Sequence, residues 1–161
     1  GFTGMDGGLG HRAVVPHVEA IGGGCGQMSC LETVASATGI SRMAKDAVAR
    51  GDRTALAHVE NMMAKDVVDA AKACDEAAIR IVNRAAFYLG KSMAAVAVVL
   101  NPELFIIGGG VSKAGDILFN EVRSVFAKLT PEPVQRGMQI VPATLGNDAG
   151  MVGAAGLFLR S

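Results

Sequence analysis

One short segment of the sequence carries a histidine, two cysteines and a carboxylate that could act together. His11 is followed by a glycine-rich stretch and then by Cys25 and Cys30, and Glu32 comes two residues after the second cysteine. Imidazole and thiolate are ligands that Zn²⁺ prefers, and glycines allow a backbone to fold them around an ion. The spacing therefore predicts a small zinc knuckle made by His11 and the two cysteines, with Glu32 held beside it.

These residue types also have ordinary structural interpretations. A loop histidine can simply be hydrogen-bonded, and cysteines are often buried as small apolar side chains. A structural zinc site normally has four ligands, and His17 is a nearby candidate for a further one. Cys74, at a predicted helix end, fits a structural role, and His58 is expected on a solvent-facing helix position.

A second chemical feature is a glycine turn. The apolar run 104–107 predicts a strand, and Gly108, Gly109 and Gly110 follow it directly. Backbone N–H groups at the start of the next helix attract anions, so the turn could contact a nucleotide phosphate. The alternative is a tight strand-to-helix turn, which is common in α/β folds. No Gly-Lys-Ser/Thr follows, and the G-x-G-x-x-G spacing is absent, so neither of these nucleotide-binding motifs is present.

Hydrophobic periodicity predicts the elements that position these residues. The segment 30–75 is expected to be helical, with Gly39 and Gly51-Asp52 as stops and a short helix over 64–74. A long helix is expected over 75–100, with Asp75 as its N-cap, Asn101-Pro102 as its end, and its second half buried on all sides. Further predicted elements are a strand over 12–15, a helix over 113–129, a strand over 138–141 and a closing helix over 146–159. Strand, glycine turn and helix together indicate an α/β fold.

Composition excludes several classes of function. The 161 residues suffice for one domain, or a large piece of one, and the 15 basic and 15 acidic residues cancel. A neutral chain with no Trp and one Tyr argues against nucleic-acid binding. Three cysteines argue against a secreted disulfide framework and favour the cytoplasm. The most apolar run, 93–107, is interrupted by Asn101-Pro102-Glu103, so no membrane span is expected.

Several motifs together resemble a known family. In chain order they are Gly10-His11, Cys25-Gly26, the run 30–40, Leu100-Asn101-Pro102, the run 107–112 and the run 145–150. This combination is similar to the C-terminal half of bacterial glucokinases of the ROK family (repressors, open reading frames and sugar kinases), in particular the Gram-positive branch. The resemblance covers nearly the whole chain.

The resemblance implies an actin-like (ribonuclease H-like) ATPase fold, in which residues 1–161 form the C-terminal, larger lobe and the N-terminal lobe lies outside this chain. It implies transfer of the γ-phosphoryl group of ATP, with Mg²⁺, to the 6-hydroxyl of glucose or a related hexose. A cytoplasmic homo-oligomer, most simply a dimer, is also implied, with no nucleic-acid or membrane partner.

By the same resemblance, His11 would bind both zinc and a sugar hydroxyl, and Glu32 would accept a hydrogen bond from another hydroxyl. Cys25 and Cys30 would be zinc ligands. Gly108, Gly109 and Gly110 would lie against the nucleotide.

The sequence departs from the family pattern at several points. The family loop reads Cys-x-Cys-Gly-x-x-Gly-Cys, but its first cysteine is Gly23 here and its later glycine is Ser29. Zinc would therefore have three matching ligands. The glutamate that precedes the family's Gly-His pair is Gly8 here.

The family's first phosphate loop and its catalytic aspartate belong to the N-terminal lobe, and nothing in this sequence matches them. We therefore expect no kinase activity from these 161 residues alone. Two alternatives stay open, namely a non-catalytic sugar-sensing domain of a ROK-type repressor and an isolated lobe whose main property is assembly.

Overall fold

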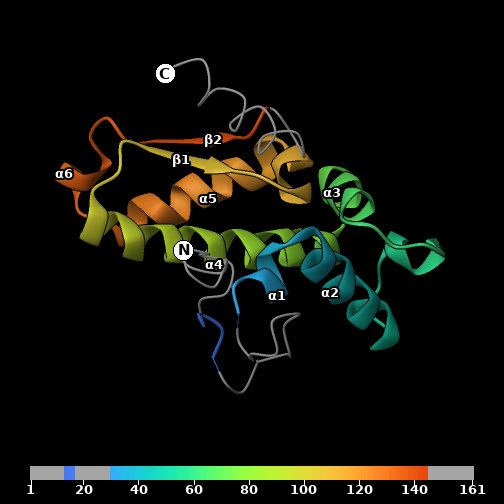
Figure 1. The fold of residues 1–161 in the computed structure, drawn as a ribbon. Coiled ribbons are helices and arrows are strands. Elements are labelled where there is room, and N and C mark those ends of the chain that lie inside the picture. The colour runs from blue at the N-terminus through green and yellow to red at the C-terminus, as the bar shows by residue number, and fades with distance from the viewer. Residues whose placement is uncertain (1–12, 17–29, 145–161) are drawn as a thin grey trace, which may run out of the picture.

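The computed structural model describes residues 13–16 and 30–144, which form a mixed arrangement of helices and a small sheet (Figure 1). The elements in chain order are α1 (Glu32–Ala35), α2 (Ala37–Ala49), the 3₁₀ turn η3 (Ala55–His58), α3 (Ala64–Lys72), α4 (Glu76–Leu100), β1 (Leu104–Ile107), the 3₁₀ turn η4 (Gly110–Ala114), α5 (Asp116–Leu129), α6 (Glu132–Gln135) and β2 (Gln139–Pro142).

The long helix α4 is the centre of the core. It packs against α1, α2, α3 and α5, and it contributes buried alanine, valine and isoleucine side chains along most of its length. The predicted boundaries are confirmed at both ends. Asp75 is the N-cap, and the C-cap Asn101, just before Pro102, adopts a left-handed conformation with a φ of 45°.

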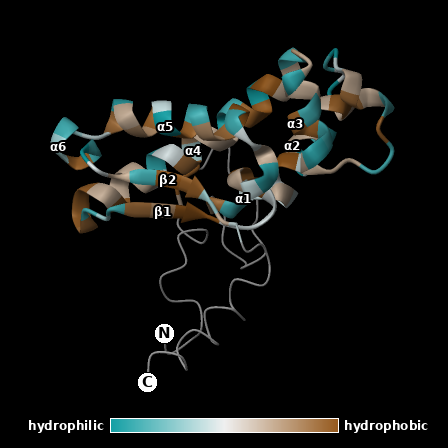
Figure 2. Ribbon diagram, turned by 90° about the horizontal axis from the view of Figure 1, so that it is seen from above, coloured by the Kyte–Doolittle hydropathy of each residue, from teal (hydrophilic) through white to brown (hydrophobic). Residues whose placement is uncertain are grey.

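The sheet consists of two parallel strands. β1 pairs with β2 so that Phe105 lies opposite Ile140, and the predicted strand at 104–107 is confirmed. α5 lies between the two strands in the chain and packs against both α4 and β2. Phe105 packs edge-to-face on Phe126 of α5, with ring centroids 6.2 Å apart. The strands include some of the most hydrophobic stretches of the ribbon (Figure 2), and on one face of β1 the side chains of Leu104 and Ile106 are exposed among the described residues.

The prediction that Gly39 stops a helix is wrong, because Gly39 lies inside α2. A Cβ atom at this position would lie 2.5 Å from the carbonyl oxygen of Thr33 in α1. Gly39 is thus explained by close packing of two backbones. The stop at Gly51 is confirmed, since α2 ends at Ala49 and Gly51 has a φ of 82°.

Three other expectations need adjustment. The helix predicted over 113–129 is divided into η4 and α5 at Gly115, whose φ is 72°. The second strand lies one residue later than predicted. Residues 90–100 are not buried on all sides, since Val98, Val99 and Leu100 are 58%, 79% and 71% exposed. Apolar composition shows that burial of a segment would be favourable, but it does not show whether another element packs against that segment.

Other predicted elements are only partly covered by the structure. Of the strand expected over 12–15, Ala13 forms a single antiparallel bridge to Cys30, and Val15 is buried. The closing helix expected over 146–159 lies outside the described residues.

His58 is exposed in η3, which agrees with its predicted solvent-facing position. Among the described residues, no helix has both the length and the apolar character needed to cross a membrane.

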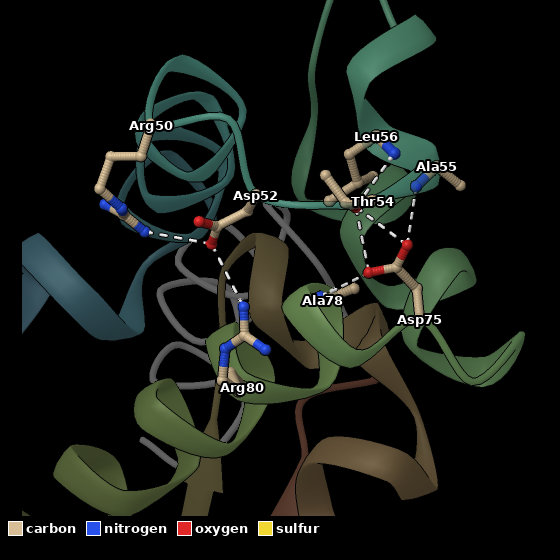
Figure 3. Close-up of polar contacts among 8 residues, drawn as sticks. All are labelled: Arg50, Asp52, Thr54, Ala55, Leu56, Asp75, Ala78 and Arg80. Atoms are coloured by element: carbon tan, nitrogen blue, oxygen red, sulfur yellow. Dashed lines mark hydrogen bonds and ion pairs between the residues drawn. The ribbon is translucent and has the colours of Figure 1, made fainter.

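Asp75 joins the start of α4 to the loop after α2 (Figure 3). Its carboxylate accepts hydrogen bonds from the N–H groups of Ala78, at 2.9 Å, and Ala55, at 2.8 Å, and from the Thr54 hydroxyl, at 2.9 Å. Partial desolvation raises the pKa of this carboxyl, but the hydrogen bonds stabilise its charged form, and the net result is a pKa below the ordinary value of 3.8. Asp52 makes a more exposed link nearby, to Arg80 on α4 at 3.2 Å.

Replacement of Asp75 by Asn is expected to lower the free energy of unfolding by about 1–2 kcal/mol at pH 7, because an uncharged amide cannot accept all of these hydrogen bonds. The folded-state pKa of Asp75 is depressed, so its contribution is present above the unfolded pKa of about 4 and is lost as the pH falls through the folded value. Urea unfolding from pH 7 to pH 3 should therefore show the difference between wild type and variant shrinking below about pH 4.

The matched control is Asp69→Asn on the surface of α3. Among the described residues, the Asp69 carboxylate makes only an exposed pair with Lys65, at 3.8 Å, and its replacement should change stability by a few tenths of a kcal/mol. If the two substitutions lowered the free energy of unfolding equally, or if the loss in the Asp75 variant did not depend on pH, the role of Asp75 as a charged cap of α4 would be contradicted.

Candidate functional site

The corner between α1 and α2 is fixed by short-range hydrogen bonds. The Ser36 hydroxyl donates to the carbonyl of Glu32, at 2.5 Å, and accepts from the N–H of Gly39, at 3.0 Å. Ser36 therefore ends α1 and caps the N-terminus of α2 with one side chain. At the other end of α1, the Thr33 hydroxyl donates to the Cys30 carbonyl, at 2.6 Å. This corner determines where Glu32 lies.

The glycine turn after β1 has a conformation that requires glycine. Gly109 has a φ of 75° and a ψ of −168°, a region that side chains disfavour strongly. Its carbonyl accepts hydrogen bonds from the hydroxyl of Ser112, at 2.7 Å, and from the N–H of the same residue, at 3.1 Å. These bonds turn the chain from β1 into η4.

The next glycine brings the turn against the α1–α2 corner. A Cβ atom at Gly110 would lie 2.6 Å from the Cβ of Ala37, the first residue of α2. Two segments more than seventy residues apart in sequence are thus in direct contact. The glycine turn and the first turn of α2 form adjacent walls of one site.

That site is a pocket of about 300 Å³. Its wall on the helical side includes Glu32, Ser36 and Ala37, and its wall on the strand side includes the turn 108–110. The remaining lining residues are all apolar, namely Leu31, Ala35, Leu89, Met93, Phe105, Ile106, Ile107 and Val111. The sequence had placed Glu32 and the glycine turn in separate motifs, and the structure brings them together.

The chemistry of the two walls is complementary. Glu32 is half-buried and supplies carboxylate oxygens, which accept hydrogen bonds from hydroxyl groups. The glycine turn presents backbone without side chains, so a ligand can approach it closely. A ligand with hydroxyls at one end and a group that contacts backbone amides at the other would fit this arrangement.

The predicted metal ligands are only partly within the described residues. His11 and Cys25 lie outside them. Cys30 is fully buried, and its backbone bridge to Ala13 brings the chain just after His11 beside it. Within residues 13–16 and 30–144, no group of three or more His, Cys, Asp or Glu side chains could hold a metal ion.

Sequence reasoning did not single out Ser36, Ala37 or Phe105 as site residues. Ser36 offered a signal, since a serine before a helical pattern is a typical N-cap. Ala37 and Phe105 carried none, because a small or an apolar side chain in a pocket wall has the same sequence pattern as one in the core.

With this geometry in place, comparison with known proteins defines the class. The model of the ROK family matches residues 1–161. The chain belongs to the ROK family, and its fold is the actin-like ATPase fold of ROK sugar kinases.

Particular relatives make the comparison more specific. The glucokinase of Halalkalibacterium halodurans is 44% identical over 164 residues, which cover 98% of this chain and 48% of the relative. A solved structure of a ROK family glucokinase from Streptomyces griseus, in complex with glucose and AMPPNP, is 32% identical with a TM-score of 0.74, and covers 92% of this chain and 50% of that one. This chain thus spans about half the length of these glucokinases.

One similar structure belongs to a different class. A ROK family transcriptional regulator, described as a homologue of the Escherichia coli MLC protein, is 30% identical with a TM-score of 0.78. The match covers 91% of this chain and 37% of the regulator. The fold is therefore shared by kinases and regulators.

Two alanine substitutions test the geometry of the glycine turn. Gly109→Ala is expected to destabilise the protein by about 1–3 kcal/mol, because its positive φ is unfavourable for alanine although the space around it is open. Gly108→Ala is the control, since its Cβ would make an ordinary contact with Ala143, at 3.9 Å. Equal thermal stability of the two variants would contradict the turn conformation.

Proposed function

We propose that this chain supplies the sugar-binding and nucleotide-binding elements of an ATP-dependent hexose kinase that converts glucose to glucose 6-phosphate. The observation that carries the proposal is that Glu32 and Gly108–Gly110 line one pocket. The proposal is supported by the similarity to glucokinases and to a glucokinase structure that contains glucose and AMPPNP.

Glu32 is the proposed sugar contact. A hexose offers many hydroxyls and little apolar surface, so a fixed carboxylate can select a hydroxyl pattern. The hydroxyls of Ser36 and Thr33 donate to backbone carbonyls at the two ends of α1, which fixes the backbone position of Glu32. An analogue without the matching hydroxyl would lose its hydrogen bond to this carboxylate.

The turn 108–110 is the proposed nucleotide contact. Its backbone can approach a phosphate or ribose without a side chain between them, and phosphoryl transfer depends mainly on positioning and charge stabilisation. Mg²⁺, bound with ATP, would neutralise phosphate charge. The base for the sugar hydroxyl is proposed to come from an N-terminal lobe, with residues 1–161 forming the C-terminal, larger lobe.

Zinc is proposed as a structural ion held by His11, Cys25 and Cys30. The support from the described residues is that Cys30 is buried two residues before Glu32 and that Ala13 bridges to it. Such an ion would order the chain on the side of α1 that precedes Glu32. His11 would then also contact a sugar hydroxyl.

We propose, finally, that the protein works in the cytoplasm as a dimer.

A sugar-sensing domain is the second candidate function. It is supported by the similarity to the ROK transcriptional regulator. A sensor needs the sugar contact but not the nucleotide, so binding of Mg-AMPPNP discriminates between the two functions.

Glu32→Gln is expected to weaken glucose binding about tenfold or more, since hydrogen bonds to a charged group contribute about 1.5–3 kcal/mol. Isothermal titration of the chain with glucose measures the loss. Glu60→Gln, at an exposed loop position, is the control and should bind glucose as the wild type does. Unchanged affinity in the Glu32 variant would remove Glu32 from the sugar site.

The 161 residues alone are expected to show no glucose-dependent ATP hydrolysis or phosphorylation, because nothing in the sequence matches the family's catalytic aspartate. A coupled assay with glucose and Mg-ATP checks this expectation. Turnover above the rate of a heat-denatured sample would show that the base lies within this chain.

A further inference from the structure

The contact between Gly110 and Ala37 has a consequence for how the two halves of the pocket work together. We propose that this contact couples the sugar and nucleotide sites, so that each ligand strengthens binding of the other. Ala37 and Gly110 are thus positioning residues, and the inference rests on the proposed function.

The first step is the contact between the turn and the helix. A Cβ at Gly110 would lie 2.6 Å from the Cβ of Ala37, well inside the distance that two carbon atoms tolerate, so the backbone of the glycine turn lies directly against the side chain of Ala37. A ligand that shifts the turn toward the helix must therefore move Ala37. Because Ala37 is the first residue of α2, the shift reaches the corner between α1 and α2.

The second step is the path from Ala37 to Glu32. Ser36, the neighbour of Ala37, donates its hydroxyl hydrogen to the carbonyl of Glu32, at 2.5 Å. Gly39 packs on the Thr33 carbonyl so closely that a Cβ would overlap it. The guanidinium of Arg42 donates to the same carbonyl. α1 and the first turns of α2 are therefore tied by hydrogen bonds and by direct backbone packing.

These contacts make the corner a single body that touches both ligand positions. The proposed sugar contact lies at its α1 end, and the proposed nucleotide contact touches its α2 end. If one ligand orders this body, the other binds an already ordered site, and by linkage the effect is reciprocal. Close packing makes such a body sensitive to displacements smaller than a methyl group.

The sequence allows a compensated pair of substitutions. Gly110→Ala inserts a methyl group that collides with Ala37, which separates the turn from the corner. Ala37→Gly removes the opposing methyl, after which the nearest atom to the new Cβ is the Ala37 Cα, at 3.9 Å. The double variant therefore keeps an alanine at position 110 without the collision. Gly108→Ala adds a methyl to the same turn without touching Ala37, and it is the matched control.

The experiment titrates the full chain with Mg-AMPPNP in the absence and presence of saturating glucose, for the wild type, Gly110→Ala, the double variant and Gly108→Ala. The wild type should bind Mg-AMPPNP at least about fivefold more tightly with glucose present. Gly110→Ala should reduce this ratio to near one, and the double variant should restore it. Gly108→Ala should weaken nucleotide binding equally with and without glucose, so its ratio should stay at the wild-type value.

Thermal unfolding of the same variants tests the contact between Gly110 and Ala37 without any ligand. Gly110→Ala should lower the melting temperature, and Ala37→Gly in the same chain should recover most of the loss. Absence of this recovery would overturn the contact itself.

The outcome of the titrations distinguishes failure of the coupling from failure of the proposed function. If the wild type binds both ligands but the ratio is one, or if Gly110→Ala keeps the wild-type ratio, the coupling is overturned while the proposed function stands. If the wild type binds neither ligand, the proposed function fails, and the coupling fails with it.

Discussion

A backbone-to-methyl contact between the glycine turn and the first residue of α2 is the constraint on which the pocket depends. It places Gly110 against Ala37, with no room for a side chain on the turn. Without this approach, Glu32 and the turn 108–110 would belong to separate surfaces of the molecule. The contact therefore explains why Glu32 shares a pocket with a turn more than seventy residues later in the chain.

The scaffold holds both walls through α4. This helix packs on α1 and α2 on one side and on α5 on the other, and α5 supports the strands from which the turn emerges. Asp75 fixes the start of α4 through several hydrogen bonds to its charged form. A substitution at Asp75 would affect the pocket only by weakening the packing of α4. Its effect would appear in the free energy of unfolding, whereas the loss of a ligand contact would appear in the binding affinity.

The sequence predicted the parts of the fold that local chemistry determines. The Asp75 cap, the end of α4 at Asn101 and the strand at 104–107 were all predicted, because capping, proline geometry and apolar runs act over a few residues. Gly39 was misinterpreted as a stop, because a glycine required by close packing has the same local pattern as one that ends a helix. The proximity of Glu32 to the glycine turn could not be read from spacing, since it depends on how distant elements pack. Membership of the ROK family was predicted from the motifs and is confirmed.

The central claim of the proposed function is that a sugar hydroxyl and a nucleotide are held on adjacent walls of one pocket. The most direct measurement is a crystal structure of the chain grown with glucose and Mg-AMPPNP. The account predicts a glucose hydroxyl within hydrogen-bonding distance of the Glu32 carboxylate and the nucleotide against Gly108–Gly110. Glucose bound away from Glu32, or nucleotide bound away from the turn, would contradict it.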